Sequence, residues 1–171
     1  TSVTKAMIYY YFGSKEGLYE VMLERAFSER FRSLQQMNLD ELPPERALEA
    51  IARWFLTDMA RNTNLPTILF YEGIQNKGKY YKRIGILAIY EKIANVLERG
   101  MASGVFRPLD PRHVAVNIVG LCNFYFCARE NIKHLWPDRQ ILSKPMLEEH
   151  LSEAIDMVLA SVSARNPYPG E

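Results

Sequence analysis

The segment at residues 4–19, TKAMIYYYFGSKEGLY, combines basic, hydroxyl-bearing and aromatic side chains. On a helix that starts after Thr4, the apolar Ile8 and Phe12 fall on one side. The other side presents small, basic and aromatic residues, namely Lys5, Ala6, Tyr9 and Tyr10. Lysine reaches phosphate or guanine, and tyrosine donates to phosphate while its ring meets thymine methyl groups. This face predicts contacts in the major groove of DNA; the alternative is an aromatic helix packed in a protein core.

A second helix is predicted directly after this one. Gly13 turns the chain, Ser14 caps the new helix, and Lys15 stands in its first turn. Free backbone N–H groups at a helix start attract anions, and a lysine beside them adds a charge, so we predict a phosphate contact. The full set of predicted DNA-contacting residues is Thr4, Lys5, Ala6, Tyr9, Tyr10 and Lys15.

Composition places few limits on function but excludes some classes. The 171 residues are 48% hydrophobic and 24% charged, which is ordinary for a globular protein. The net charge is +1, so any binding to nucleic acid must depend on a local basic patch. The nearly apolar residues 114–128 are too few to span a bilayer, and no signal peptide is recognisable. We therefore expect a cytoplasmic protein without membrane contacts.

Capping residues, prolines and glycines divide the chain into helices, and no alternating strand pattern lies between them. The expected helices cover about residues 5–11, 15–37, 44–61, 66–76, 80–102, 111–131 and 144–164. Residues 165–171 are rich in proline and glycine and should form a flexible tail. The predicted fold class is all-α.

Two helices carry more apolar surface than one buried face requires. Residues 114–128 are apolar nearly all round, and the last helix has a continuous apolar stripe. The alternatives are a single monomeric core and a homodimer in which both helices meet a second copy, and we favour the homodimer. The predicted interface residues are Val114, Ile118, Leu121, Tyr125, Leu151, Ile155, Val158 and Val162.

Glu72 continues the apolar stripe of its helix, where a carboxylate needs a partner. That partner is either an internal arginine, Arg129 or Arg53, or a bound ligand. Asn117 and Asn123 lie about 120° apart on one helix, so one is expected to face a pocket and the other the dimer interface. The predicted ligand-binding residues are Phe70, Glu72, Asn117, Asn123 and Phe126.

Motifs for catalysis are not found in the sequence. There is no nucleophile elbow, no glycine-rich phosphate loop and no HExxH pattern, and the three histidines are scattered. We therefore expect no catalytic residues, no metal site and no cofactor.

Residues 2–23, SVTKAMIYYYFGSKEGLYEVML, resemble the recognition helix and following helix of the TetR family of bacterial one-component regulators. The matching positions are Val3, Thr4, Ile8, Tyr9, Tyr10, Phe12, Ser14, Lys15, Glu16 and Leu18. Ser2 stands where the family usually has glycine. Residues 69–83 and 103–120 are also similar to the C-terminal domains of the pyrimidine-utilisation regulator branch.

The resemblance implies a domain organisation and a function. Residues 1–20 would be the second half of a helix-turn-helix DNA-binding domain, whose first two helices, the usual cover for Ile8 and Phe12, are missing. Residues 21–164 would form a helical ligand-binding and dimerisation domain. The implied function is a ligand-responsive repressor that binds operator DNA as a homodimer and responds to an unknown small-molecule effector. The alternative is a helical small-molecule-binding or protein-interaction module without a DNA role; an enzyme is not expected.

Overall fold

The computed structural model describes residues 4–81 and 84–164 of the chain. Within these residues the regular structure is helical apart from one isolated backbone bridge. This confirms the predicted all-α fold. The α-helices are α1 (Lys5–Phe12), α2 (Lys15–Gln35), α3 (Pro44–Arg61), α4 (Leu65–Asn76), α5 (Leu87–Ala102), α6 (Pro111–Cys127), α7 (Arg129–Ile132) and α8 (Lys144–Val162). Two short 3-10 helices are η1 (Leu39–Glu41) and η2 (Lys133–Leu135).

Three helix starts, those of α1, α2 and α6, follow from local capping chemistry. The Thr4 hydroxyl accepts a hydrogen bond from the Met7 N–H, and Ser14 does the same for Gly17 at 3.0 Å. Asp110 accepts from two N–H groups in the first turn of α6. These side chains satisfy donors that a helix start leaves free, so the predicted starts of α1, α2 and α6 are confirmed.

Two predicted helices are shorter in the structure. The helix expected from about residue 80 starts only at Leu87, because Lys77, Gly78 and Gly85 adopt left-handed backbone angles that interrupt a right-handed helix. The helix expected to run to about residue 131 ends at Cys127, and α7 follows as a separate turn. Residues 165–171, the predicted tail, lie outside the described residues.

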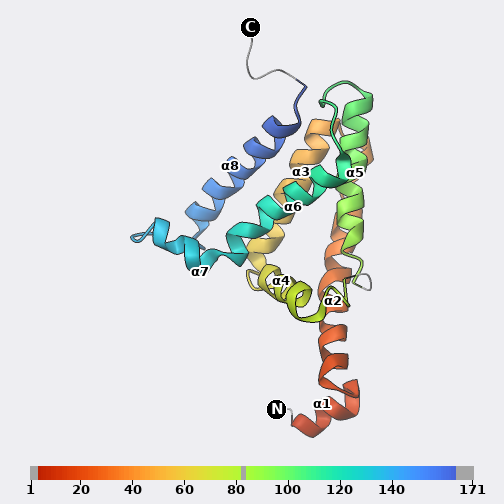
Figure 1. The fold of residues 1–171 in the computed structure, drawn as a ribbon, viewed down its shortest axis with the longest axis vertical. Coiled ribbons are helices and arrows are strands. Elements are labelled where there is room, and N and C mark those ends of the chain that lie inside the picture. Colours follow the sequence, from red (N-terminus) through yellow and green to blue (C-terminus); the bar gives the residue numbers. More distant parts are fainter. Residues whose placement is uncertain (1–3, 82–83, 165–171) are drawn as a thin grey trace.

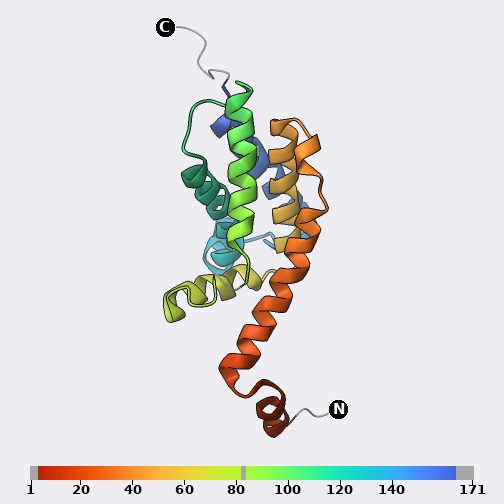
Figure 2. The same cartoon turned by 90° about the vertical axis from the view of Figure 1, so that its right-hand side faces the viewer.

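Helix α3 packs at the centre of the bundle, in contact with α2, α5, α6 and α8 (Figures 1 and 2). Its buried face repeats at helical spacing, with residues Ala47, Leu48, Ile51, Ala52, Phe55, Leu56 and Met59. Each large apolar side chain buried in this way contributes about 1.5–3 kcal/mol. The bundle around α3 therefore supplies most of the hydrophobic stabilisation.

The segment that follows α5 packs against α5 and forms backbone hydrogen bonds with the end of α8. A Cβ on Gly100 would lie 1.9 Å from the Phe106 ring, so only glycine lets this buried ring lie against α5. Phe106 forms a backbone bridge with Ser163, and the Arg107 N–H donates to the Val162 carbonyl at 2.9 Å. The chain after α5 is therefore held against the last turn of α8.

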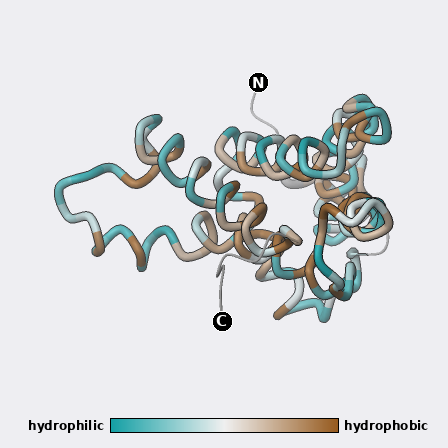
Figure 3. The backbone as a smooth tube through the Cα atoms, turned by 90° about the horizontal axis from the view of Figure 1, so that it is seen from above, coloured by the Kyte–Doolittle hydropathy of each residue, from teal (hydrophilic) through white to brown (hydrophobic). Residues whose placement is uncertain are grey.

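Two parts project from the bundle. Helix α1 and the first half of α2 extend below it in Figure 1, which places α1 away from the core. The segment that joins α7 to α8 projects on another side, as the view from above also shows (Figure 3). No helix within the described ranges is long and apolar enough to cross a membrane.

Candidate functional site

Helix α1 presents aromatic surface to solvent. Tyr10 is 83% exposed and Tyr9 is also exposed, as are Thr4 and Ala6. Ile8 and Phe12 on the other side are partly buried, which matches the predicted division of the helix into two faces. The Lys5 side chain lies outside the described residues, so its predicted contact stays a prediction.

The junction between α1 and α2 is tightly packed. A Cβ on Gly17 would lie 2.2 Å from the Phe12 carbonyl oxygen, so glycine permits the close approach of the two helices. Lys15 is exposed as the first residue of α2, beside the helix-start N–H groups. The orientation of α1 is therefore tied to that of α2, which runs into the bundle.

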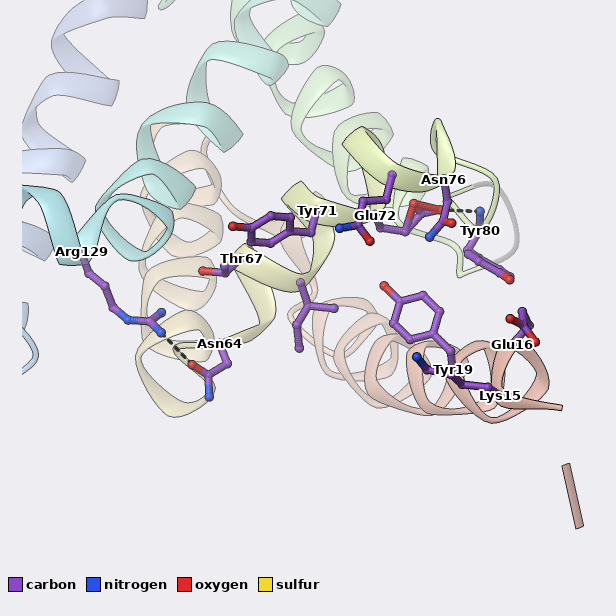
Figure 4. Close-up of a pocket in the computed structure, with 12 residues that line it drawn as sticks. Lys15, Glu16, Tyr19, Asn64, Thr67, Tyr71, Glu72, Asn76, Tyr80 and Arg129 are labelled. Atoms are coloured by element: carbon purple, nitrogen blue, oxygen red, sulfur yellow. Dashed lines mark hydrogen bonds between the residues drawn. The ribbon is translucent and has the colours of Figure 1, made fainter. Parts of the chain in front are cut away.

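A cavity of about 870 Å³ lies between the start of α2, helix α4 and the turn that follows α4 (Figure 4). Glu72 and Tyr71 line it from α4, Tyr19 from α2, and Tyr80 from the turn. Burial raises the pKa of the Tyr19 hydroxyl, and the nearby Glu72 and Tyr80 raise it further, so this hydroxyl remains a hydrogen-bond donor at neutral pH. The other lining residues are Lys15, Glu16, Asn64, Thr67, Ile68, Gln75, Asn76 and Arg129.

Glu72 is 1% exposed, as its position on the apolar stripe of α4 predicted. Its Oε1 accepts a hydrogen bond from the Tyr80 backbone N–H at 2.8 Å. Its Oε2 is buried and has no hydrogen-bond partner among the described residues, and the same holds for Thr67 Oγ1 in this cavity. The carboxylate is therefore only half satisfied.

The predicted salt bridge from Glu72 to Arg129 or Arg53 is wrong. Arg129 binds the Thr63 carbonyl at 2.6 Å and Asn64 Oδ1 at 2.8 Å, while Arg53 pairs with Glu49 one turn away on α3. The oxygens of Thr63 and Asn64 lie directly before the start of α4, within reach of Arg129. Glu49 lies one turn from Arg53 on the same helix, so each guanidinium has its own acceptors. The ligand alternative for Glu72 remains.

A second, interior cavity lies between α2, α3, α5 and α6, and Asn123 Oδ1 is buried there without a partner among the described residues. Beside it, Arg30 forms an ion pair with Asp58 and donates to the Ala26 carbonyl at 2.7 Å. The interior cavity has a volume of about 20 Å³, and one water needs roughly 10–15 Å³. In this conformation the cavity therefore fits a water and no organic ligand.

The predicted ligand-binding residues do not form one site. Glu72 lines the larger cavity and Asn123 the interior one, whereas Asn117 is exposed on the outer side of α6. Phe70 is exposed on α4, and Phe126 is core with 1% exposure. Sequence reasoning missed Tyr19 and Tyr80 as cavity walls. Tyr19 stands four residues before Leu23 on the buried stripe of α2, and this spacing is a signal that the sequence contains. Tyr80 stands in a turn, whereas the sequence predicts a helix there.

The predicted dimer residues are mostly core of the protomer. Ile118, Tyr125, Ile155, Val158 and Val162 are buried, and Val114, Leu121 and Leu151 are partly exposed. The apolar stripe of α8 is covered by α3 within the same chain, which sequence periodicity cannot foresee.

Large apolar residues are nevertheless exposed on the same two helices. Val116 and Phe124 project from α6 and Met157 from α8. Phe124 and Val116 border a shallow groove that also contains His150, whose ring stacks on Tyr125 with centroids 4.0 Å apart. Helix α6 is therefore apolar on both its inner and outer sides, as predicted.

Reactive side chains are not assembled into a site within the described residues. Burial raises the pKa of the Cys122 thiol to about 12, which leaves it un-ionised and unreactive. No group of three or more histidine, cysteine, aspartate or glutamate side chains in the described ranges could hold a metal ion.

The bundle, with a short helix carried at the end of a long one, defines an all-helical architecture of the TetR type. The family model described as "Tetracyclin repressor-like, C-terminal domain" matches residues 44–158, and the chain belongs to this family. The predicted family is thus confirmed, while the narrower pyrimidine-utilisation branch stays a prediction.

Known proteins similar to the chain include regulators from several bacteria. The HTH-type transcriptional repressor NicS of Pseudomonas putida is 31% identical over 131 residues, which are 74% of this chain and 62% of that protein. The chain thus spans less than two thirds of this curated relative.

Solved structures of low sequence identity share the fold. A regulatory protein of the tetR family from Rhodococcus RHA1 has a TM-score of 0.74 and 15% identity, over 96% of this chain and 82% of that one. A TetR/AcrR-family regulator from Thermobifida fusca has a TM-score of 0.68 and 18% identity, over 98% and 81%.

Proposed function

We propose that this chain belongs to a ligand-responsive transcriptional repressor that binds operator DNA as a homodimer. The observation that carries the proposal is the exposed Tyr9–Tyr10 face of α1, joined through the Gly17 contact to the long helix α2 of a TetR-family bundle. The likeness to a protein named as an HTH-type transcriptional repressor supports it. The same relationships favour a non-enzymatic, cytoplasmic protein.

The proposed DNA contacts are those of α1 and the start of α2. Thr4, Lys5, Ala6, Tyr9 and Tyr10 would enter the major groove, and Lys15 would bind a phosphate. Residues 1–20 would thus belong to the DNA-binding domain and residues 21–164 to the ligand-binding and dimerisation domain. Helix α2 is continuous across this boundary, so a shift of α2 in the bundle would move α1 directly.

The proposed homodimer uses α6 and α8. Val116, Phe124 and Met157 supply exposed apolar surface on these helices, and the partly exposed Val114, Leu121 and Leu151 would lie beside it. A two-fold axis there would place two copies of α1 on one side of the dimer. Ligand binding would repress or restore DNA binding by favouring one spacing of these helices, since successive major grooves are about 34 Å apart.

A gel-shift titration tests the proposal, with the full-length protein and the DNA upstream of its own gene. We expect a specific band that weakens steeply as salt increases, because basic side chains release counterions from the phosphates. If no specific band forms even at low salt, the proposal fails and the chain is better described as a helical ligand-binding module.

A further inference from the structure

The cavity at the start of α2 differs from the interior one in both size and chemistry. At about 870 Å³ it lies in the range of small-molecule sites, and the interior space of about 20 Å³ does not. The walls of the larger cavity come from α2 and α4. A bound ligand would therefore contact both α2, the helix that carries α1, and α4 of the bundle.

The Glu72 carboxylate is a buried, charged group in the wall of this cavity. One oxygen is occupied by the Tyr80 N–H and the other is unpaired among the described residues, although the side chain is 1% exposed. A buried carboxylate without a full set of partners is costly, so Oε2 is a site that a donor or a cation would stabilise.

The basic residues near the cavity do not fill this role. Arg129 is bound to Thr63 and Asn64 at the far end of the cavity, as Figure 4 shows for Asn64. The Lys79 ammonium lies 5.2 Å from the centre of the Tyr80 ring, over its face. No ion pair to Glu72 is found among the described residues, which leaves its charge open to a ligand.

Two of the aromatic residues that line the cavity, Tyr19 and Tyr80, lie close to the Glu72 carboxylate. Tyr19 and Tyr80 meet edge to face with centroids 5.6 Å apart, and Tyr71 stands on the same helix as Glu72. Figure 4 shows the Tyr19 ring and the Glu72 side chain on facing sides of the cavity. Flat rings beside a negative charge favour a flat cation, through ring contact and cation–π attraction together.

We propose that this cavity binds a small, flat organic cation, such as an amidinium or protonated aromatic amine, whose N–H groups donate to Glu72 Oε2 while its ring packs against Tyr19. The ligand would bridge α2 and α4 and thereby set the position of α2. Its effect on DNA rests on the proposed function above, whereas the binding itself does not.

Isothermal titration calorimetry of the full-length protein tests the proposal with three probes of nearly the same shape. Benzamidine is cationic, benzamide neutral and benzoate anionic. We expect benzamidine to bind, benzamide to bind at least tenfold more weakly, and benzoate to give no heat. Preferred binding of benzoate, equal binding of benzamide, or no heat from any probe would overturn the proposal, even if the protein still binds its operator.

Two substitutions place the probe in the cavity. Glu72→Gln keeps an oxygen for the Tyr80 N–H but removes the charge, so benzamidine should bind at least tenfold more weakly. Glu16→Gln removes an exposed carboxylate on the rim of the same cavity and should change the affinity less than twofold. Equal losses in both variants would show a general charge effect and contradict the assignment to Glu72.

If Glu72→Gln fails to fold, the variant Tyr19→Leu tests instead whether benzamidine binds in this cavity. This variant keeps apolar volume on α2 but removes the aromatic wall, and benzamidine should bind at least threefold more weakly. Unchanged affinity in Tyr19→Leu would place the probe elsewhere and overturn the proposed site.

Discussion

The ring of Tyr19 on α2 meets the ring of Tyr80 edge to face, with centroids 5.6 Å apart and planes at 74°. Tyr80 also donates its backbone N–H to Glu72 of α4. The helix that carries α1 is thus linked to α4 through one residue of a turn. A structural change at Glu72 or Tyr80 would therefore reach α1 through the contact of Tyr80 with Tyr19 on α2.

The first prediction concerns the junction of α1 and α2. In the full-length protein, Gly17→Ala should weaken operator binding at least tenfold, because a Cβ 2.2 Å from the Phe12 carbonyl oxygen forces α1 to move. A gel shift measures this loss, and circular dichroism should show an unchanged melting temperature of the bundle. Gly73→Ala on α4 is the control, since its Cβ would meet nothing within 4 Å. Equal binding by both variants would contradict a fixed α1.

The second prediction concerns Lys15 as a phosphate contact. Lys15→Ala should weaken binding to all DNA sequences and reduce the slope of log affinity against log salt by about 1. Lys144 is a matched control, because it is also the first residue of a helix that follows a serine. If Lys144→Ala gives the same change of slope, the effect belongs to net charge. Tyr10→Ala should instead alter the preference among operator sequences.

The third prediction concerns the dimer. Phe124→Glu should produce monomers in sedimentation experiments without unfolding the bundle, because Phe124 is 64% exposed on α6. Phe70→Glu changes an equally exposed phenylalanine, 63%, on α4 and should leave the dimer intact. Dissociation by Phe70→Glu alone would move the interface to α4.

A buried charge should act differently from an exposed one. Val158→Asp, at a position first expected in the dimer interface, should unfold the protomer, because Val158 is 2% exposed inside it. Loss of the helical circular dichroism signal checks this result. A folded monomer would show that Val158 faces the partner after all.

The fourth prediction separates the two functions of the Glu72 carboxylate. Glu72→Ala leaves the buried Tyr80 N–H without its acceptor and should lower the free energy of unfolding by about 1–3 kcal/mol. Glu72→Gln retains that acceptor and should cost less than about 1 kcal/mol without ligand. Urea denaturation measures both values. A large loss in Glu72→Gln would indicate that the negative charge has an internal partner.

The fifth prediction concerns pH. Burial lowers the pKa of His150 below its ordinary 6.5, so the unfolded chain binds the proton more readily than the folded one. The contribution of His150 to stability is present above pH 6.5 and is lost as the pH falls toward its folded-state pKa. Urea denaturation at pH 7.5 and 5 should show this loss, and His150→Phe, which keeps the stacking on Tyr125, should show less of it. An identical pH dependence in this variant would assign the loss to other groups.

The sequence by itself determined the helices that begin with local signals. Thr4, Ser14 and Asp110 cap α1, α2 and α6 because a side-chain oxygen reaches N–H groups only two or three residues away. The all-α class, the exposed face of α1 and the burial of Glu72 followed in the same way from periodicity along one helix.

Tertiary structure alone decided which buried face meets which partner. The apolar stripe through Val158 has the same sequence pattern whether α3 or a second copy of the chain covers it. In the structure α3 covers it. Likewise, the sequence around Glu72 does not predict that the Tyr80 N–H is its hydrogen-bond partner. Left-handed backbone angles at Lys77 and Gly78 turn the chain so that this N–H lies against α4. Periodicity shows that a side chain is buried, but the atoms that surround it depend on how the helices are packed together.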